Sequence, residues 1–78
     1  MSRVVITVMP KSGVLDPEGQ AVQRALAGLG FDGVRDARIG KRIELVVEDD
    51  DPAAAAGRMC DALLANPLIE DFEIEVRE

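Results

Sequence analysis

The sequence contains no histidine, tryptophan or tyrosine, and its 78 residues include one cysteine and two phenylalanines. Without histidine, a general base active near neutral pH would have to be a carboxylate or a lysine with a shifted pKa. The single thiol, Cys60, excludes a disulfide within the chain and so excludes the small secreted domains that disulfides hold together. A metal site would need carboxylates alone, because Cys60 has no histidine to join it.

Basic charge and long apolar runs are also scarce. Nine lysines and arginines face fifteen aspartates and glutamates, and the net charge of −6 argues against binding to nucleic acid or to an anionic membrane. The apolar run at residues 4–9 is too short for a signal peptide, and no stretch is long enough to span a bilayer. We therefore expect one cytoplasmic domain that covers residues 1–78.

The dipeptide Asp-Pro marks the start of a first helix. Asp16 can cap the first free N–H groups, and Pro17 suits the first helical position. Gly30 supplies a left-handed stop, with Phe31 placed to cover the last turn. Apolar residues at helical spacing form a stripe between these signals, made of Val22, Ala25, Leu26 and Leu29.

A second helix repeats this plan. It begins at Asp51-Pro52 and ends at Asn66-Pro67. Its predicted stripe consists of Ala56, Met59, Cys60, Leu63 and Leu64.

Two segments have the pattern of strands. Residues 4–9 are apolar on both faces, which predicts a strand covered on both sides. Residues 71–77 alternate strictly, so that Phe72, Ile74 and Val76 point inward. With the middle segment read as a strand, the order β-α-β-α-β indicates a weak internal duplication of the ferredoxin-like kind.

The middle segment, residues 34–48, allows two interpretations. Gly40-Lys41 could form a two-residue hairpin turn, but that register would place apolar and charged residues on one face. Read as a single strand, the segment keeps its apolar residues on one face, which favours one long strand bent or bulged at Gly40. Such a strand would reach roughly 50 Å, whereas a domain of this length has a radius of gyration of only about 11–12 Å. We therefore predict a homodimer that shares these strands.

No group of residues assembles into a catalytic, cofactor-binding or metal site. Lys11-Ser12-Gly13 resembles half of a phosphate loop, but the pattern GxxxxGK[ST] is absent. Residues 48–51 are all acidic, yet they lack the spacing of a calcium loop and are interpreted as a solvated loop that ends in a helix cap. Cys60 lies on an apolar stripe, where a buried thiol acts as a small hydrophobe.

Three blocks along the chain carry a family resemblance. PKSGVLDPEGQAV at residues 10–22, GK at residues 40–41 and CDALLANPLIEDFEIEV at residues 60–76 resemble the PurS family in order and spacing. The family comprises small subunits of bacterial and archaeal phosphoribosylformylglycinamidine synthase, an enzyme of purine biosynthesis. This chain has Glu18 where the family usually has glutamine, and Phe72 where it usually has tyrosine.

The resemblance implies a fold and a set of partners. It implies an α+β fold related to ferredoxin-like domains, with two helices packed on an antiparallel sheet and a long central strand bent near Gly40 and shared across a dimer. PurS-like chains join a PurL-like synthetase subunit and a PurQ-like glutaminase subunit, and they are thought to bridge them for ammonia transfer. ATP and Mg²⁺ belong to the synthetase, so no cofactor is expected on this chain. Whether dimers pair into a tetramer stays open.

Lys11, Ser12 and Gly13 form a short, accessible connection for which the sequence indicates no structural role. We predict that they contact the synthetase or the glutaminase, with Lys41 as a further contact residue. The alternative function is a small ferredoxin-like regulatory domain that binds a metabolite at a dimer seam.

Overall fold

The computed structural model describes residues 1–77. The chain forms β1 (Ser2–Pro10), α1 (Pro17–Gly28), β2 (Lys41–Val47), α2 (Pro52–Met59), a π-helical turn η1 (Cys60–Leu64) and β3 (Glu70–Arg77). This order confirms two helices and a three-stranded antiparallel sheet. None of the described helices is long and apolar enough to cross a membrane.

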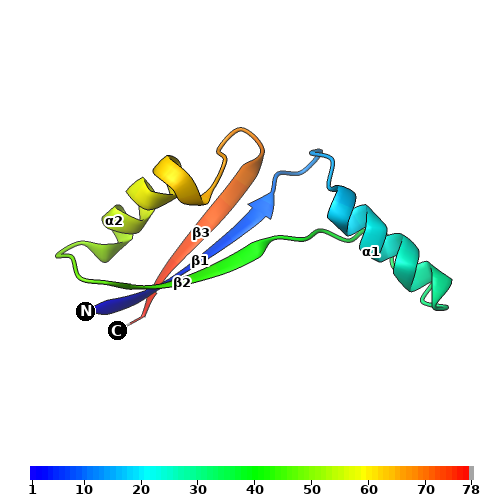
Figure 1. Ribbon diagram of the computed structural model, residues 1–78, viewed down its shortest axis with the longest axis horizontal. Coiled ribbons are helices and arrows are strands. Elements are labelled where there is room, and N and C mark those ends of the chain that lie inside the picture. Colours follow the sequence, from blue (N-terminus) through cyan, green and yellow to red (C-terminus); the bar gives the residue numbers. More distant parts are fainter. Residues whose placement is uncertain (78) are drawn as a thin grey trace.

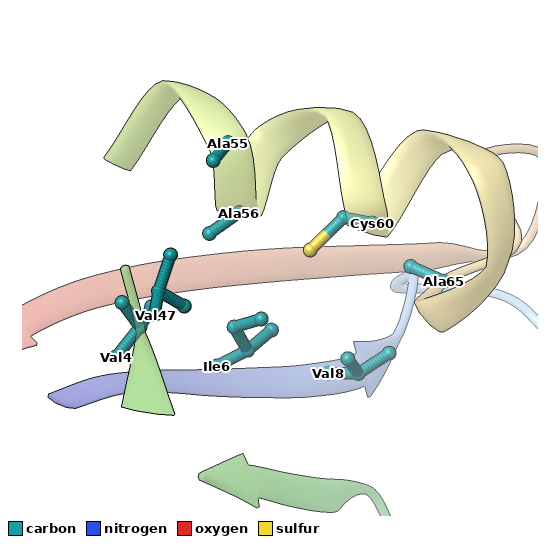
Figure 2. Close-up of a cluster of buried hydrophobic side chains, with 8 residues drawn as sticks. All are labelled: Val4, Ile6, Val8, Val47, Ala55, Ala56, Cys60 and Ala65. Atoms are coloured by element: carbon teal, nitrogen blue, oxygen red, sulfur yellow. The ribbon is translucent and has the colours of Figure 1, made fainter. Parts of the chain in front are cut away.

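β1 is the central strand, and the sheet order is β2-β1-β3. Ile6 pairs with Ile43 on one side and with Ile74 on the other, so apolar residues of all three strands share one face. The helix α2 packs against β1 and β3 on this face. The resulting core is drawn in Figure 2 and consists of Val4, Ile6, Val8, Val47, Ala55, Ala56, Cys60 and Ala65.

Within residues 1–77, no helix covers the opposite face of the sheet, so cover on both sides of β1 stays a prediction. Arg3 and Thr7 are exposed on this face. Val5 is nevertheless only 4% exposed. It pairs with Glu44 on β2 and Glu75 on β3, and the aliphatic stems of such long side chains can shield an apolar neighbour.

The helix α1 lies beyond the end of the sheet, whereas α2 lies on one face of the sheet (Figure 1). The molecule is correspondingly elongated, with extents of 50 × 26 × 14 Å and a radius of gyration of 15.7 Å. A compact domain of this length would have a radius of about 11–12 Å. Within residues 1–77, the predicted stripe of α1 is therefore not packed on the sheet: Leu26 is half-buried, but Leu29 at the end of the stripe is 75% exposed.

The middle segment contains one strand and no hairpin, so the hairpin interpretation is wrong. The strand is shorter than predicted, because β2 pairs with β1 only from Lys41, whose partner is Val8. Residues 34–40, which we call the arm, run past the end of this pairing without regular secondary structure. In the strand order β2-β1-β3, β2 lies at the edge of the sheet. The arm leads from α1 into this edge strand (Figure 1).

The stripe predicted for the second helix is only partly correct. Ala56 and Cys60 are buried, but Leu63 is 82% exposed. The backbone N–H of Ala65 donates to the carbonyl of Cys60 at 3.1 Å, which closes a turn of five residues and rotates the end of the helix. Because of this rotation, Ala65 takes the buried position that a continuous α-helix would not have given it.

Candidate partner-binding site

The β1–α1 loop begins with a tight turn that has a defined shape. The N–H of Val14 donates to the carbonyl of Lys11 at 3.1 Å, and Gly13 adopts a φ of +83°, a conformation that favours glycine. The N–H of Lys11 donates to the carbonyl of Ile69 at 2.8 Å, which ties the loop to the segment before β3. Residues 11–13 therefore have a structural role that the sequence did not indicate.

Two cations flank this turn. The ammonium group of Lys11 lies 3.2 Å from a carboxylate oxygen of Asp71, and the Lys11 side chain is 41% exposed. The guanidinium group of Arg38 donates to the carbonyl of Pro10 at 3.0 Å and so links the arm to the end of β1. Both side chains remain accessible to a partner.

The turn and the arm enclose a hollow of about 180 Å³. Its walls are residues 10–16, Gln20 and residues 36–38, so Lys11, Ser12 and Gly13 all line it together with Arg38. Asp16 and Asp36 also line it, which makes the hollow polar and of mixed charge. The structure thus brings together three of the four residues predicted to contact a partner.

Lys41 lies outside this hollow. It is the first residue of β2 and lines a separate shallow hollow of about 330 Å³ with Glu18, Ile39, Gly40 and Glu70. Arg38 is the residue that the sequence reasoning missed. A cluster of basic residues in the sequence could have indicated Arg38, because four of the nine lysines and arginines lie within residues 35–42.

Asp16 caps α1 as predicted and also makes a second bond. One carboxylate oxygen accepts from the N–H of Gly19 at 3.0 Å, and the other accepts from the N–H of Ile39 on the arm at 2.8 Å. The bond from Gly19, followed by the bond from Ile39, lowers the pKa of Asp16 below its ordinary value, since both stabilise the charged form. The carboxylate therefore joins the start of α1 to the arm.

A second, apolar surface lies beside α2. Because α2 packs against β1 and β3, Leu45 on β2 remains only half-buried. It opens into a groove of about 300 Å³ whose walls are almost wholly apolar. The groove is lined by Leu45, Met59, Ala62, Leu63 and Leu64.

The acidic residues before α2 and the thiol of Cys60 have structural roles in the fold. Asp49 accepts from the N–H of Asp51 at 2.9 Å, and Asp51 caps α2 by accepting from the N–H of Ala54 at 3.1 Å. Cys60 is fully buried, and burial, followed by the nearby charge of Asp61, raises the pKa of its thiol. Across residues 1–77, no three His, Cys, Asp or Glu side chains lie close enough together to hold a metal ion.

Comparison with known proteins gives consistent relatives. The family model described as PurS, phosphoribosylformylglycinamidine (FGAM) synthase, matches residues 3–78. The phosphoribosylformylglycinamidine synthase subunit PurS of Bacillus subtilis is 46% identical over 80 residues, covering 100% of this chain and 95% of the relative. The subunit of the same name in Synechocystis is 49% identical over 77 residues, covering 95% of this chain and 75% of the relative.

Solved structures agree with these relatives. Bacillus subtilis PurS superposes with a TM-score of 0.93 at 46% identity, with 100% of both chains covered. A chain in the structure of PurLQS from Thermotoga maritima superposes with a TM-score of 0.80 at 29% identity, covering 96% of this chain and 95% of that one. The family match, the identities and the shared fold confirm the resemblance seen in the sequence. The chain therefore belongs to the PurS family of phosphoribosylformylglycinamidine synthase.

Proposed function

We propose that this chain is a non-catalytic assembly subunit that bridges a PurL-like synthetase and a PurQ-like glutaminase. Its role is to keep the two active sites together, so that ammonia released from glutamine reaches formylglycinamide ribonucleotide in the ATP-dependent amidation. The observation that carries this proposal is the match to a chain of the PurLQS structure over 96% of this chain. The complex works in the cytoplasm, and its synthetase subunit uses the ATP and Mg²⁺.

The bridging subunit is a homodimer. The apolar stripe of α1 and the apolar groove beside α2 are two unpartnered surfaces of one chain, and α1 is held beyond the sheet by the arm (Figure 1). A second copy can supply the missing partner, because its α1 can lie in the groove of the first copy and the reverse contact forms by two-fold symmetry. Full burial of one leucine or phenylalanine side chain contributes about 1.5–3 kcal/mol, so a few such residues per copy stabilise the dimer.

The bridge meets its partner subunits through the β1–α1 turn. Lys11, Ser12 and Gly13 line one hollow with Arg38, and Lys41 follows the arm directly as the first residue of β2. These cations stand out on a chain whose net charge is −6. An acidic surface of the synthetase or the glutaminase is therefore the chemical complement of this region.

The bridging role is tested by reconstitution. Purified PurL-like and PurQ-like subunits are assayed for glutamine-dependent synthesis with and without this chain, and for ammonia-driven synthesis as a control for an intact synthetase. We expect glutamine-dependent synthesis only when the chain is present. Synthesis from glutamine at the full rate without the chain would rule out an obligatory bridge.

The homodimer is tested on the isolated chain. Leu29→Glu places a charge on the α1 stripe at a residue that is already 75% exposed in one copy, so the fold of that copy should tolerate it. Leu68→Glu is the matched control, because Leu68 is 83% exposed and lies on neither the stripe nor the groove. Sedimentation should show a dimer for the wild type and the control, and a monomer for Leu29→Glu.

A further inference from the structure

The two Asp-Pro helix starts differ in one respect. Asp51 caps α2 through a bond to the N–H of Ala54. Asp16 caps α1 in the same way through Gly19, but its second oxygen also holds the N–H of Ile39, which lies 23 residues along the chain. A residue that starts one helix therefore also fixes where that helix lies relative to the arm.

We infer that Asp16 is a positioning residue for the contact between two copies of this chain. Its carboxylate holds α1 against the arm and so sets the direction in which the apolar stripe of α1 is presented to the second copy. The inference rests on the proposed homodimer and adds to it the residue that pre-organises the interface.

The restraints on α1 support this role, because they concentrate on the arm. Among residues 1–77, the side-chain hydrogen bonds that tie α1 to more distant parts of the chain both end there. One joins Asp16 to Ile39, and the other runs from the amide of Gln23 to the carbonyl of Val34 at 3.2 Å. Extensive packing between α1 and the sheet is absent from residues 1–77, as α1 lies beyond the sheet (Figure 1).

Gly19 allows this approach. A Cβ atom at residue 19 would overlap the carbonyl oxygen of Ala37, so the first turn of α1 lies in backbone contact with the arm. This contact keeps α1 close to the arm, and the bond from Gln23 to Val34 restrains it again one turn further along. The two oxygens of Asp16 add the strongest of these restraints, because they hold amides from both segments at once and bonds to a charged group are stronger than neutral ones.

The length of α1 makes its tilt important. With 12 residues, α1 extends about 18 Å from the point that Asp16 holds. A tilt of about 15° at this point would move the far end of the helix by about 5 Å, which is roughly half the distance between two packed helices. Leu29 lies at this far end, so loss of the constraint would move it out of register with the groove of the second copy.

The test compares Asp16→Ser with Asp51→Ser. Serine is a good N-cap, so both helices keep their first bond, but a single short hydroxyl cannot reach Gly19 and Ile39 as two separate oxygens do. Sedimentation equilibrium on the isolated chain should show a dimer dissociation constant at least tenfold higher for Asp16→Ser. Asp51→Ser should stay within about threefold of the wild type, since Asp51 has no bond to the arm to lose.

A second pair of variants leaves the cap intact. Ile39→Pro removes the N–H that Asp16 holds together with the isoleucine side chain, and Ile39→Ala removes that side chain but keeps the N–H. The dissociation constant of the proline variant should be at least tenfold higher than that of the alanine variant. This pair decides the matter if Asp16→Ser fails to fold.

Hydrogen exchange tests the bond between Asp16 and Ile39 separately from dimer formation. The amide of Ile39 should exchange faster in Asp16→Ser than in the wild type, while the core amides of β1 stay protected. If Asp16→Ser and Ile39→Pro both have the dimer dissociation constant of the wild type, the inference is wrong but the homodimer is unaffected. A wild type that is monomeric at every concentration would instead overturn the homodimer, and the inference would fall with it.

Discussion

Gly40 lies so close to the carbonyl oxygen of Val8 that a Cβ atom at residue 40 would overlap it. Only Gly13 and Gly30 have a positive φ among the glycines of residues 1–77, so Gly40 does not rely on the left-handed conformation. Its lack of a side chain lets the arm enter the sheet beside the end of β1, where the next residue, Lys41, pairs with Val8. Glycine is needed at residue 40 because a side chain would have no room beside β1.

Replacement of Gly40 by alanine should therefore lower the free energy of unfolding by about 1–3 kcal/mol, because a backbone oxygen cannot move aside as a flexible side chain can. Urea unfolding measures the loss. Gly33→Ala is the control, since nothing lies within 4 Å of its Cβ position, and its effect should stay within about 0.5 kcal/mol. Equal stability of the two variants would show that the arm can shift away from Val8.

Local signals in the sequence predicted the helix ends well. Asp16 caps α1, and Gly30 ends it with a φ of +96°. The N–H of Phe31 donates to the carbonyl of Leu26 at 3.0 Å, as expected after a left-handed glycine. These features depend on neighbouring residues along the chain, and for that reason a pattern of residue types is enough to find them.

Features that depend on distant residues were harder to predict. The stripe of α1 indicates that the helix has an apolar partner, but a periodic pattern does not say which chain supplies it. The bond between Asp16 and Ile39 and the link between Arg38 and Pro10 join segments that lie more than 20 residues apart. The π-helical turn was missed because a stripe at α-helical spacing assumes that the helix continues without an added residue.

Stability should fall in acid partly through Asp16. Its pKa is lowered in the folded chain by the N–H groups of Gly19 and Ile39. The stabilisation is therefore present above the unfolded value of 3.8 and is lost as the pH falls through the lower, folded pKa. Unfolding midpoints measured from pH 6 to pH 2 should fall less steeply for Asp16→Ser than for the wild type.

Glu75 provides the control for this measurement. Its pKa is also lowered, chiefly by a side-chain hydrogen bond from Arg77, so its contribution to stability is likewise lost as the pH falls. Glu75→Gln removes that contribution but leaves the bonds of Asp16 in place. If Asp16→Ser shows the full acid slope of the wild type, the carboxylate does not act as a charged cap in solution.

Cys60 should be unreactive in the native chain. Its side chain is fully buried against β1 (Figure 2), and burial raises the pKa of the thiol, so little thiolate is available to attack a reagent. Labelling with a disulfide reagent should be at least about a hundredfold slower in buffer than in 6 M guanidinium chloride, because it requires opening of the fold. Fast labelling in buffer would mean that α2 separates readily from the sheet.

Lys11→Glu should weaken assembly much more than it affects the isolated chain. The substitution removes an exposed ion pair with Asp71, and such pairs contribute about 0–1 kcal/mol, so melting should change little. It also replaces a positive by a negative side chain in the hollow beside Arg38, and binding to the assembled partner subunits should weaken by about 1–3 kcal/mol if an acidic group is paired there. Titration of each variant against those subunits measures the difference.

Arg58→Glu is the control with the same change of charge. Arg58 is exposed on α2 and does not line the hollow, so its reversal reports only the long-range effect of net charge. Lys11→Glu should bind at least about fivefold more weakly than Arg58→Glu, which corresponds to the lower end of the expected range. If the two variants bind alike, the β1–α1 turn does not meet the partner. Lys41→Glu is then the next variant to titrate, because Lys41 lies in the other hollow along the arm.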